Sequence, residues 1–157
     1  MPTGFDDLVD ADGYGICIAS ADKMAALNWL ATRAAAHTGF DARLIAEGVM
    51  LREALGSTAF GGGVAIPHAR MAGLVSVMVE IAVLASPVDF AAIDDQPVDI
   101  VVLMLSPEAA GADHLKALAR ISRTLRDPAR LAAMRAATDS AGLRAALHIV
   151  EAPRKAA

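Results

Sequence analysis

The stretch REALGSTAFGGGVAIPHAR, residues 52–70, gathers an arginine, two hydroxyl residues, a run of glycines and a histidine into one short segment. Neutral imidazole is available near pH 7 and is a competent nucleophile. Phosphoryl transfer depends mainly on positioning and on compensation of the negative oxygens. The segment therefore predicts that His68 accepts a phosphoryl group.

The residues before His68 are of types that bind phosphoryl oxygens. Arg52 supplies a guanidinium group, and Ser57 and Thr58 supply hydroxyl donors. The glycines 61–63, with Gly61 and Gly63 at their ends, allow main-chain N–H groups to approach an anion closely. The same letters also fit a glycine-rich turn that ends in a surface histidine, so spacing alone leaves both interpretations open.

Three other kinds of site do not match residues 52–70. A phosphate-binding P-loop needs Lys-Ser or Lys-Thr after its glycines, and neither follows here. A dinucleotide fingerprint needs glycines before a helix, whereas these precede an expected strand. No second histidine or cysteine lies at metal-ligand spacing near His68. We therefore expect neither a metal ion nor a cofactor.

His114 is the second candidate among the histidines. It lies at the start of an expected helix, where free N–H groups and the helix dipole attract anions. An imidazole there would donate a hydrogen bond to a phosphoryl oxygen. A histidine at such a boundary is also common without any function. His37 and His148 lie at expected helix C-termini, and we interpret both as structural.

Composition narrows the class of protein. The chain has 157 residues, 55% of them hydrophobic, and a formal net charge of −4, which favours one globular domain. No basic tract suits nucleic acid. There is no signal peptide, and the longest apolar tract is too short to span or insert into a membrane. The single Cys17 fits a buried strand in a reducing cytoplasm.

The expected elements alternate at first and then become helical. Short apolar runs predict strands at 14–19, 64–66, 74–84 and 98–105. Helical spacing predicts helices at 21–37, 42–55, 113–126 and 128–137, with a last helix after Asp139. Ser20 and Asp41 are expected N-caps, and Gly39 is an expected left-handed C-cap. Such an order predicts an α/β fold, a mixed sheet covered by helices.

Each of the first, second and third helices has an expected buried face. The residues assigned to these faces are Met24, Leu27, Ala31 and Ala34; then Leu44, Ile45, Gly48, Val49, Leu51 and Leu55; then Leu115, Leu118, Ile121 and Leu125.

The chain resembles the fructose/mannitol-type enzyme IIA domains of the bacterial phosphotransferase system. Residues 52–70 are similar to the active-site signature of that family. VDFAAIDDQPVDI at 88–100 and RAATDSAGLRAAL at 135–147 resemble two further stretches. The likeness runs over residues 6–149, which leaves 150–157 as a frayed tail. The segment PVDFAAIDDQPVD most resembles the corresponding segment of the nitrogen-related branch of the family, enzyme IIA-Ntr.

The resemblance implies both a fold and a set of roles. The fold would be a mixed sheet of about five strands flanked by helices. His68 would be phosphorylated at Nε2 by a phospho-HPr-like carrier, and His114 would hydrogen-bond the phosphoryl group. Arg52 would lie beside the site, and Ser57 and Thr58 match the Ser-Thr pair of the motif.

The motif departs from the family pattern at two places. Gly62 stands where the family usually has asparagine, and Ala59-Phe60 stands where it often has Gly-Ile or Gly-Val. A third glycine gives the loop more freedom and reduces its preorganisation, so we expect an effect on the transfer rate.

Three functions remain open from the sequence. In the nitrogen-related branch, phosphorylation by an HPr- or NPr-type carrier would regulate targets such as a sensor kinase or potassium-transport proteins. Alternatively, His68 would pass its phosphate to an enzyme IIB for a fructose- or mannitol-like sugar. The third alternative is a binding module that is not phosphorylated. An apolar docking patch is expected at Phe60, Val64 and Met71, and Phe60 equally fits a side chain that packs inward and anchors the loop.

Overall fold

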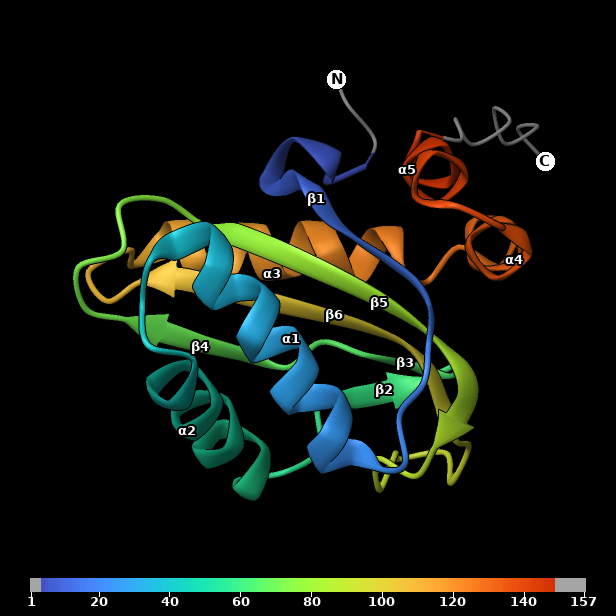
Figure 1. The fold of residues 1–157 in the computed structure, drawn as a ribbon, viewed down its shortest axis with the longest axis horizontal. Helices are drawn as coiled ribbons and strands as arrows, with labels where there is room; N and C mark the ends of the chain where they lie inside the picture. The colour runs from blue at the N-terminus through green and yellow to red at the C-terminus, as the bar shows by residue number, and fades with distance from the viewer. Residues whose placement is uncertain (1–3, 149–157) are drawn as a thin grey trace, which may run out of the picture.

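The computed structural model describes residues 4–148, which form one mixed sheet with helices on both faces (Figure 1). The strands in spatial order are β1-β5-β6-β3-β2, and β4 also pairs with β6. β5 and β6 are antiparallel, whereas β1 runs parallel to β5, and β3 and β4 run parallel to β6. The strands are β1 (Val9–Ile18), β2 (Ala59–Gly61), β3 (Val64–Ala65), β4 (His68–Met71), β5 (Met78–Val88) and β6 (Val98–Pro107).

β3 and β4 lie end to end along the same edge of β6. Val64 is opposite Ile100, and His68 is opposite Met104. The break between them falls at Pro67, whose carbonyl still accepts a hydrogen bond from the N–H of Met104 at 3.0 Å. The sheet has six strands if the two are counted separately and the expected five if they are one interrupted strand. The strand expected at 64–66 does not end the pairing with β6, because His68 begins β4.

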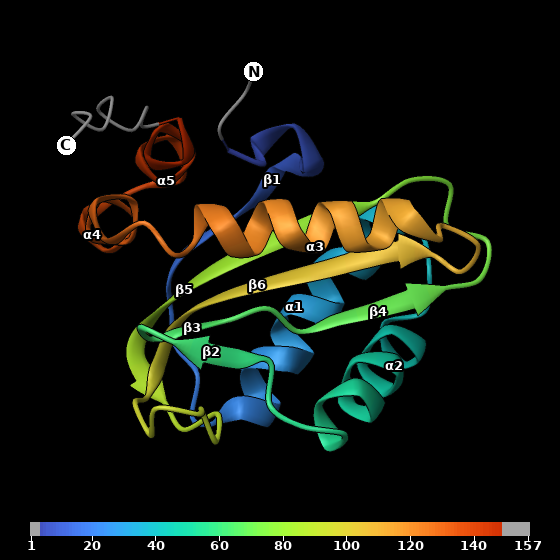
Figure 2. The same cartoon turned by 180° about the vertical axis from the view of Figure 1, so that it is seen from behind.

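Helices cover the two faces of the sheet (Figures 1 and 2). α1 and α2 pack on one face, and α3 lies on the other with α4 and α5 beyond it. None of the helices within residues 4–148 is long and apolar enough to cross a membrane. The helices are α1 (Lys23–Thr38), α2 (Ala42–Ala54), α3 (Ala112–Thr124), α4 (Pro128–Ala136) and α5 (Ser140–Leu147), with a 3-10 turn at Asp6–Leu8. The expected tail at 150–157 lies outside the described residues.

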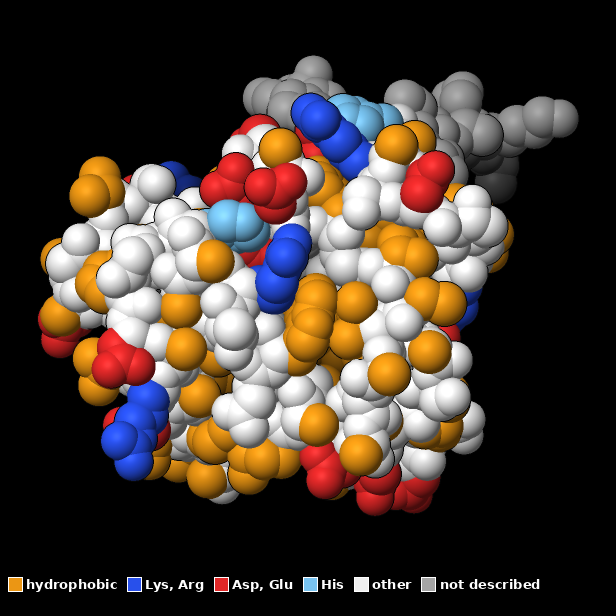
Figure 3. All heavy atoms as spheres, viewed as in Figure 1, with side chains coloured by type: hydrophobic (Ala, Val, Ile, Leu, Met, Phe, Trp, Pro, Cys, Tyr) orange, Lys and Arg blue, Asp and Glu red, His pale blue; other side chains and the backbone are white. Residues whose placement is uncertain are grey.

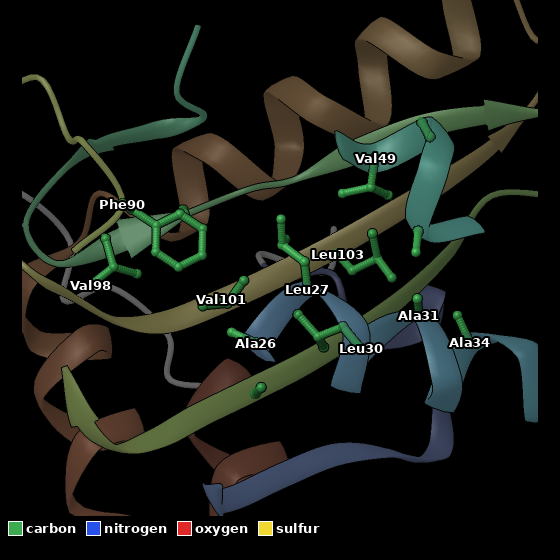
Figure 4. Close-up of a cluster of buried hydrophobic side chains, with 14 of the residues drawn as sticks. Ala26, Leu27, Leu30, Ala31, Ala34, Val49, Phe90, Val98, Val101 and Leu103 are labelled. Carbon is green, nitrogen blue, oxygen red and sulfur yellow. The ribbon is translucent and has the colours of Figure 1, made fainter. Parts of the chain in front are cut away.

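The sheet separates two apolar layers because side chains alternate along each strand. On β6, Val101 and Leu103 face α1 and α2, as Figure 4 shows for part of that layer. Val102 and Met104 face α3 on the opposite side. A central strand that is buried on both faces reads as a nearly continuous apolar run, as β6 does in the sequence.

Side-chain caps fix most helix starts. Asp41 caps α2 and Asp139 caps α5, each accepting a main-chain N–H, and Gly39 ends α1 with φ +78°. The expected cap of α1 is wrong. Asp22, rather than Ser20, accepts the N–H of Ala25 at 2.8 Å, while Ser20 donates to the Asp22 carbonyl.

Two strand predictions need correction. β1 begins at Val9 and not at Tyr14, and Cys17 is exposed on it with φ +56° instead of being buried. The strand expected at 74–84 begins four residues later, since a turn at Gly73, with φ +85°, occupies the preceding segment.

The expected helix faces are also partly wrong. In α2 the buried side chains are Ile45, Ala46, Val49 and Glu53, so this face packs on the sheet. Several residues that we expected to be buried are instead exposed at the surface. These residues are Met24, Leu44, Leu51, Leu55 and Leu115.

Candidate functional site

His68 occupies the first position of β4, immediately after Pro67. Proline fixes its own backbone and restricts the residue before it, so the histidine projects from a rigid base. Its Nδ1 lies 2.8 Å from the carbonyl oxygen of Ile66. A carbonyl accepts only, so Nδ1 carries the proton and donates. Nε2 then keeps its lone pair and is the nucleophilic atom.

Burial lowers the pKa of His68 below its ordinary value of 6.5. The charge of Arg52 lowers this pKa further, while the Ile66 carbonyl and the Glu53 carboxylate oppose the shift. The imidazole is therefore mainly neutral at pH 7, as a nucleophile must be.

His114 lies next to His68 although the two residues come from different elements. The ring centroids are 5.6 Å apart, and the ring planes are inclined by 56°. His114 is buried on the first turn of α3, and its Nδ1 hydrogen-bonds the hydroxyl of Ser106 on β6. When Ser106 donates, Nε2 of His114 carries a proton that is available to an anion. Burial is also the main cause that lowers the pKa of His114, with smaller contributions from Arg70 and His68.

Arg52 approaches the site from the opposite layer of the molecule. It lies on the last turn of α2 and donates through Nη1 to the carbonyl of Gly56 at 2.9 Å. Among the residues that the structure describes, no carboxylate forms an ion pair with Arg52, and its charge acts on His68. The structure thus brings Arg52, His68 and His114 together.

Ser57 and Thr58 hold the loop after α2 in place. The Ser57 hydroxyl donates to the Phe90 carbonyl at 2.6 Å. The Thr58 hydroxyl donates to the carboxylate of Glu53. Both hydroxyls are therefore used within the protein, which differs from the expected role of free donors to a phosphoryl group.

The structure does not bring Gly61 and Gly63 to His68. The glycines form the turn between β2 and β3, beside Ile100 at the start of β6. His68 pairs with Met104, four residues further along β6 and so roughly 13 Å away at ~3.3 Å per residue. The expectation that these amides surround the phosphoryl group is wrong.

Other groups hold the glycine turn. Gly62, with φ +70°, donates its N–H to Asp94 at 3.1 Å, and its carbonyl accepts from Arg135 at 2.6 Å. The Gly63 carbonyl accepts from the N–H of Asp99 at 3.0 Å. A positive φ favours glycine here without strain, so Gly62 suits this turn whatever its effect on transfer.

Two of the three residues expected to form an apolar docking patch are not exposed. Val64 and Met71 are buried, and Phe60 packs under the guanidinium of Arg126, 5.7 Å from its ring centre. Three exposed leucines instead belong to the elements that carry the site. They are Leu51 at 72% exposure, Leu55 at 85% and Leu115 at 63%.

Sequence reasoning missed Ser106, Glu53, Lys23 and Arg70. Ser106 directly follows the apolar run of β6, and a polar residue at the end of a buried strand could have indicated a site residue. Glu53 follows Arg52 in the motif, but nothing in its spacing indicates that it is buried. Within residues 4–148, no three His, Cys, Asp or Glu side chains are grouped so as to hold a metal ion.

Comparisons with known proteins agree on one family. A family model described as "Phosphoenolpyruvate-dependent sugar phosphotransferase system, EIIA 2" matches residues 14–148. A nitrogen regulatory protein of Bradyrhizobium diazoefficiens is 46% identical over 134 residues, covering 85% of this chain and 88% of that protein. A fructose-specific EIIABC component of Bacillus subtilis is 34% identical over 85 residues, covering 54% of this chain and 13% of that protein.

The fold agrees with a solved structure. The crystal structure of the nitrogen regulatory protein IIA-Ntr of Neisseria meningitidis superposes with a TM-score of 0.83 at 25% identity. The match covers 91% of this chain and 98% of that one. The mixed sheet with flanking helices is therefore the fold of this family.

Proposed function

Since this chain belongs to the EIIA 2 family of the phosphoenolpyruvate-dependent sugar phosphotransferase system, we propose that Nε2 of His68 accepts a phosphoryl group from a histidine-phosphorylated carrier protein. The single observation that carries the proposal is the hydrogen bond from Nδ1 of His68 to the Ile66 carbonyl at 2.8 Å. It leaves the lone pair on Nε2 of a half-buried ring whose pKa is lowered.

The transfer is a displacement at phosphorus. Nε2 of His68 forms a P–N bond as the P–N bond to the carrier's imidazole breaks, and that imidazole departs with the electron pair. The three equatorial oxygens carry the negative charge during the exchange. His114, whose ring centroid is 5.6 Å from that of His68, donates Nε2–H to one of them. Arg52 supplies a positive charge from the side of α2.

We propose that the phosphorylated form signals to regulatory partners. A phosphohistidine adds negative charge at His68, and the segments that carry Arg52 and His114 also carry three exposed apolar residues, namely Leu51, Leu55 and Leu115. The carrier would dock on these side chains, and a regulatory target would sense whether the phosphoryl group is present. The 46% identity to a nitrogen regulatory protein over 85% of this chain supports regulation as the role.

Sugar uptake is the second candidate. The likeness to a fructose-specific component supports it, but that match has lower identity and covers 54% of this chain. In this case His68 would pass its phosphoryl group to an enzyme IIB. The chemistry at His68 is the same, so the acceptor in a second transfer separates the two functions.

The decisive experiment is phosphoryl transfer followed by intact-mass measurement. The protein is incubated with phosphoenolpyruvate, enzyme I and an HPr- or NPr-type carrier that is shown to be charged. We expect one phosphate on the wild type and none on His68→Ala. His148→Ala is the matched control, because His148 is exposed and lies at the end of α5. An unmodified wild type would refute the proposal and favour a binding module that is not phosphorylated.

A further inference from the structure

The side chain of Lys23, at the start of α1, contacts two other segments of the chain. Its Nζ lies 2.8 Å from Oε2 of Glu53 and 3.4 Å from the carbonyl oxygen of Phe90. The same ammonium group lies 5.1 Å from the centre of the Phe90 ring. Glu53 is on the last turn of α2, and Phe90 follows β5. Lys23 therefore links α1 to α2 and to the segment after β5.

The carboxylate of Glu53 holds the start of the loop that leads to β2. The Glu53 side chain is 5% exposed, so its charge is almost removed from water. It accepts the N–H of Thr58, with 3.3 Å to each oxygen, and it also accepts the Thr58 hydroxyl. A buried carboxylate is costly unless it is paired and hydrogen-bonded, and Lys23 and Thr58 meet both requirements.

Main-chain hydrogen bonds continue from this loop to the reactive ring. The N–H of Ile66 donates to the Thr58 carbonyl at 3.3 Å. The carbonyl of Ile66 accepts from Nδ1 of His68 at 2.8 Å. A continuous path of polar contacts thus runs from Lys23 through Glu53, Thr58 and Ile66 to His68.

We propose that Glu53 and Lys23 are positioning residues that keep His68 protonated at Nδ1, so that Nε2 stays free. Groups that do not touch the reacting atoms fix a tautomer by orienting the hydrogen-bond acceptor of the ring. Here that acceptor is the carbonyl of Ile66, and its direction depends on how Thr58 is held. The consequence for phosphoryl transfer rests on the proposed function, whereas the tautomer is a property of the free protein.

Glu53 also acts on His68 through its charge. The carboxylate raises the pKa of His68, against the larger effect of burial and the effect of Arg52. Neutralising Glu53 therefore lowers the pKa of His68 further, and this shift can be measured without any phosphoryl donor. A residue that merely stabilised the fold would leave the titration of His68 unchanged.

The test measures the tautomer and the pKa of His68 by nitrogen-15 NMR of the imidazole in the unphosphorylated, full-length protein. In the wild type we expect the Nδ1–H form. In Glu53→Gln we expect a lower pKa and an increased fraction of the Nε2–H form. Glu47→Gln is the matched control, since Glu47 is exposed on the same helix and pairs with Arg43 at 3.8 Å.

Variants at two further residues of the path, Lys23 and Thr58, complete the test. Lys23→Gln should shift the tautomer in the same direction as Glu53→Gln, and Lys23→Arg should restore it because the positive charge returns. Thr58→Val keeps the size of the side chain and removes only the hydroxyl, so it replaces Glu53→Gln as the test if that variant fails to fold.

The rate of phosphorylation at saturating carrier should fall about tenfold in Glu53→Gln with KM unchanged.

The outcomes separate this inference from the proposed function. A folded Glu53→Gln protein, or a folded Thr58→Val protein in its place, with the same tautomer and pKa as the wild type would overturn the inference. A shifted tautomer in a protein whose wild type accepts no phosphoryl group would support the inference and refute the proposed function.

Discussion

The imidazole rings of His68 and His114 lie with their centroids 5.6 Å apart, and each ring has its Nδ1 held by a different partner. The Ile66 carbonyl holds His68, and the Ser106 hydroxyl holds His114. Neither Nε2 atom is used by these two hydrogen bonds, so in the proposed transfer Nε2 of His68 is the nucleophile and Nε2 of His114 is the donor. This division of roles leads to the first prediction.

Replacing His114 by alanine should slow phosphoryl transfer without removing the acceptor. The loss of one donor to the developing negative charge is expected to reduce the rate about 10²-fold. Rapid-quench measurement of phosphohistidine formation checks this, with His148→Ala as the control. A His114→Ala rate equal to that of the wild type would show that this ring does not contact the transferred group.

The pH dependence of phosphoryl acceptance should follow His68. Only the neutral ring is a nucleophile, and the pKa of His68 lies below 6.5. The rate should therefore be constant from about pH 7 to 8 and fall only below about pH 6.5, as Nε2 gains a proton. An NMR titration of the ring gives the pKa independently of the carrier. A midpoint above 6.5 would contradict the direction of the shift.

Leu55→Asp should weaken docking of the carrier. Leu55 is 85% exposed at the end of α2, so a charge there does not disturb the core. We expect KM for the carrier to rise roughly tenfold while kcat is unchanged, because an apolar contact is lost.

The control for this docking prediction is Leu44→Asp. Leu44 is exposed near the beginning of the same helix, at the opposite end from Arg52. Equal values of KM for Leu55→Asp and Leu44→Asp would place the carrier on another surface.

Gly63→Ala should reduce stability but not the reaction. Gly63 has φ +79°, and an added Cβ would lie 2.6 Å from Nη2 of Arg135 and 3.1 Å from Oδ1 of Asp99. We expect a loss of about 2 kcal/mol in the free energy of unfolding, measured with urea.

The folded fraction of Gly63→Ala should accept phosphate at the rate of the wild type, since the glycine turn lies away from His68. The comparison variant is Gly111→Ala, which has φ +54°; apart from its two chain neighbours, no described residue has an atom within 4 Å of an added Cβ. A Gly63→Ala protein that is as stable as the wild type but accepts phosphate slowly would show that the glycine turn contributes to the reaction.

Local signals in the sequence predicted the parts of the fold that depend on local chemistry. Asp41 caps α2 as expected, and Gly39 ends α1 in the left-handed conformation. β2 and β4 were missed because runs of three and four residues are too short for a periodic pattern. Such strands exist because of their partners in the sheet, which sequence spacing does not give.

The sequence predicted only part of the geometry of the candidate site. The residue types of Arg52, His68 and His114 indicated phosphoryl chemistry, and the structure brings them together. The position of Gly63 depends on the register of β3 against β6, which is a tertiary property. Leucines occur on both faces of α2, so packing on the sheet, and not periodicity, selects Ile45 and Val49 for burial.

The two apolar layers have a consequence for how local unfolding would affect the candidate site. The site takes His114 from the α3 side of the sheet and Arg52 from the α2 side. Figure 3 shows that apolar side chains are exposed on the α1 side of the molecule. Detachment of one helix opens the molecule locally and leaves β5 and β6 paired. Such an opening at α2 would move Arg52 away from His68 before the whole molecule unfolds.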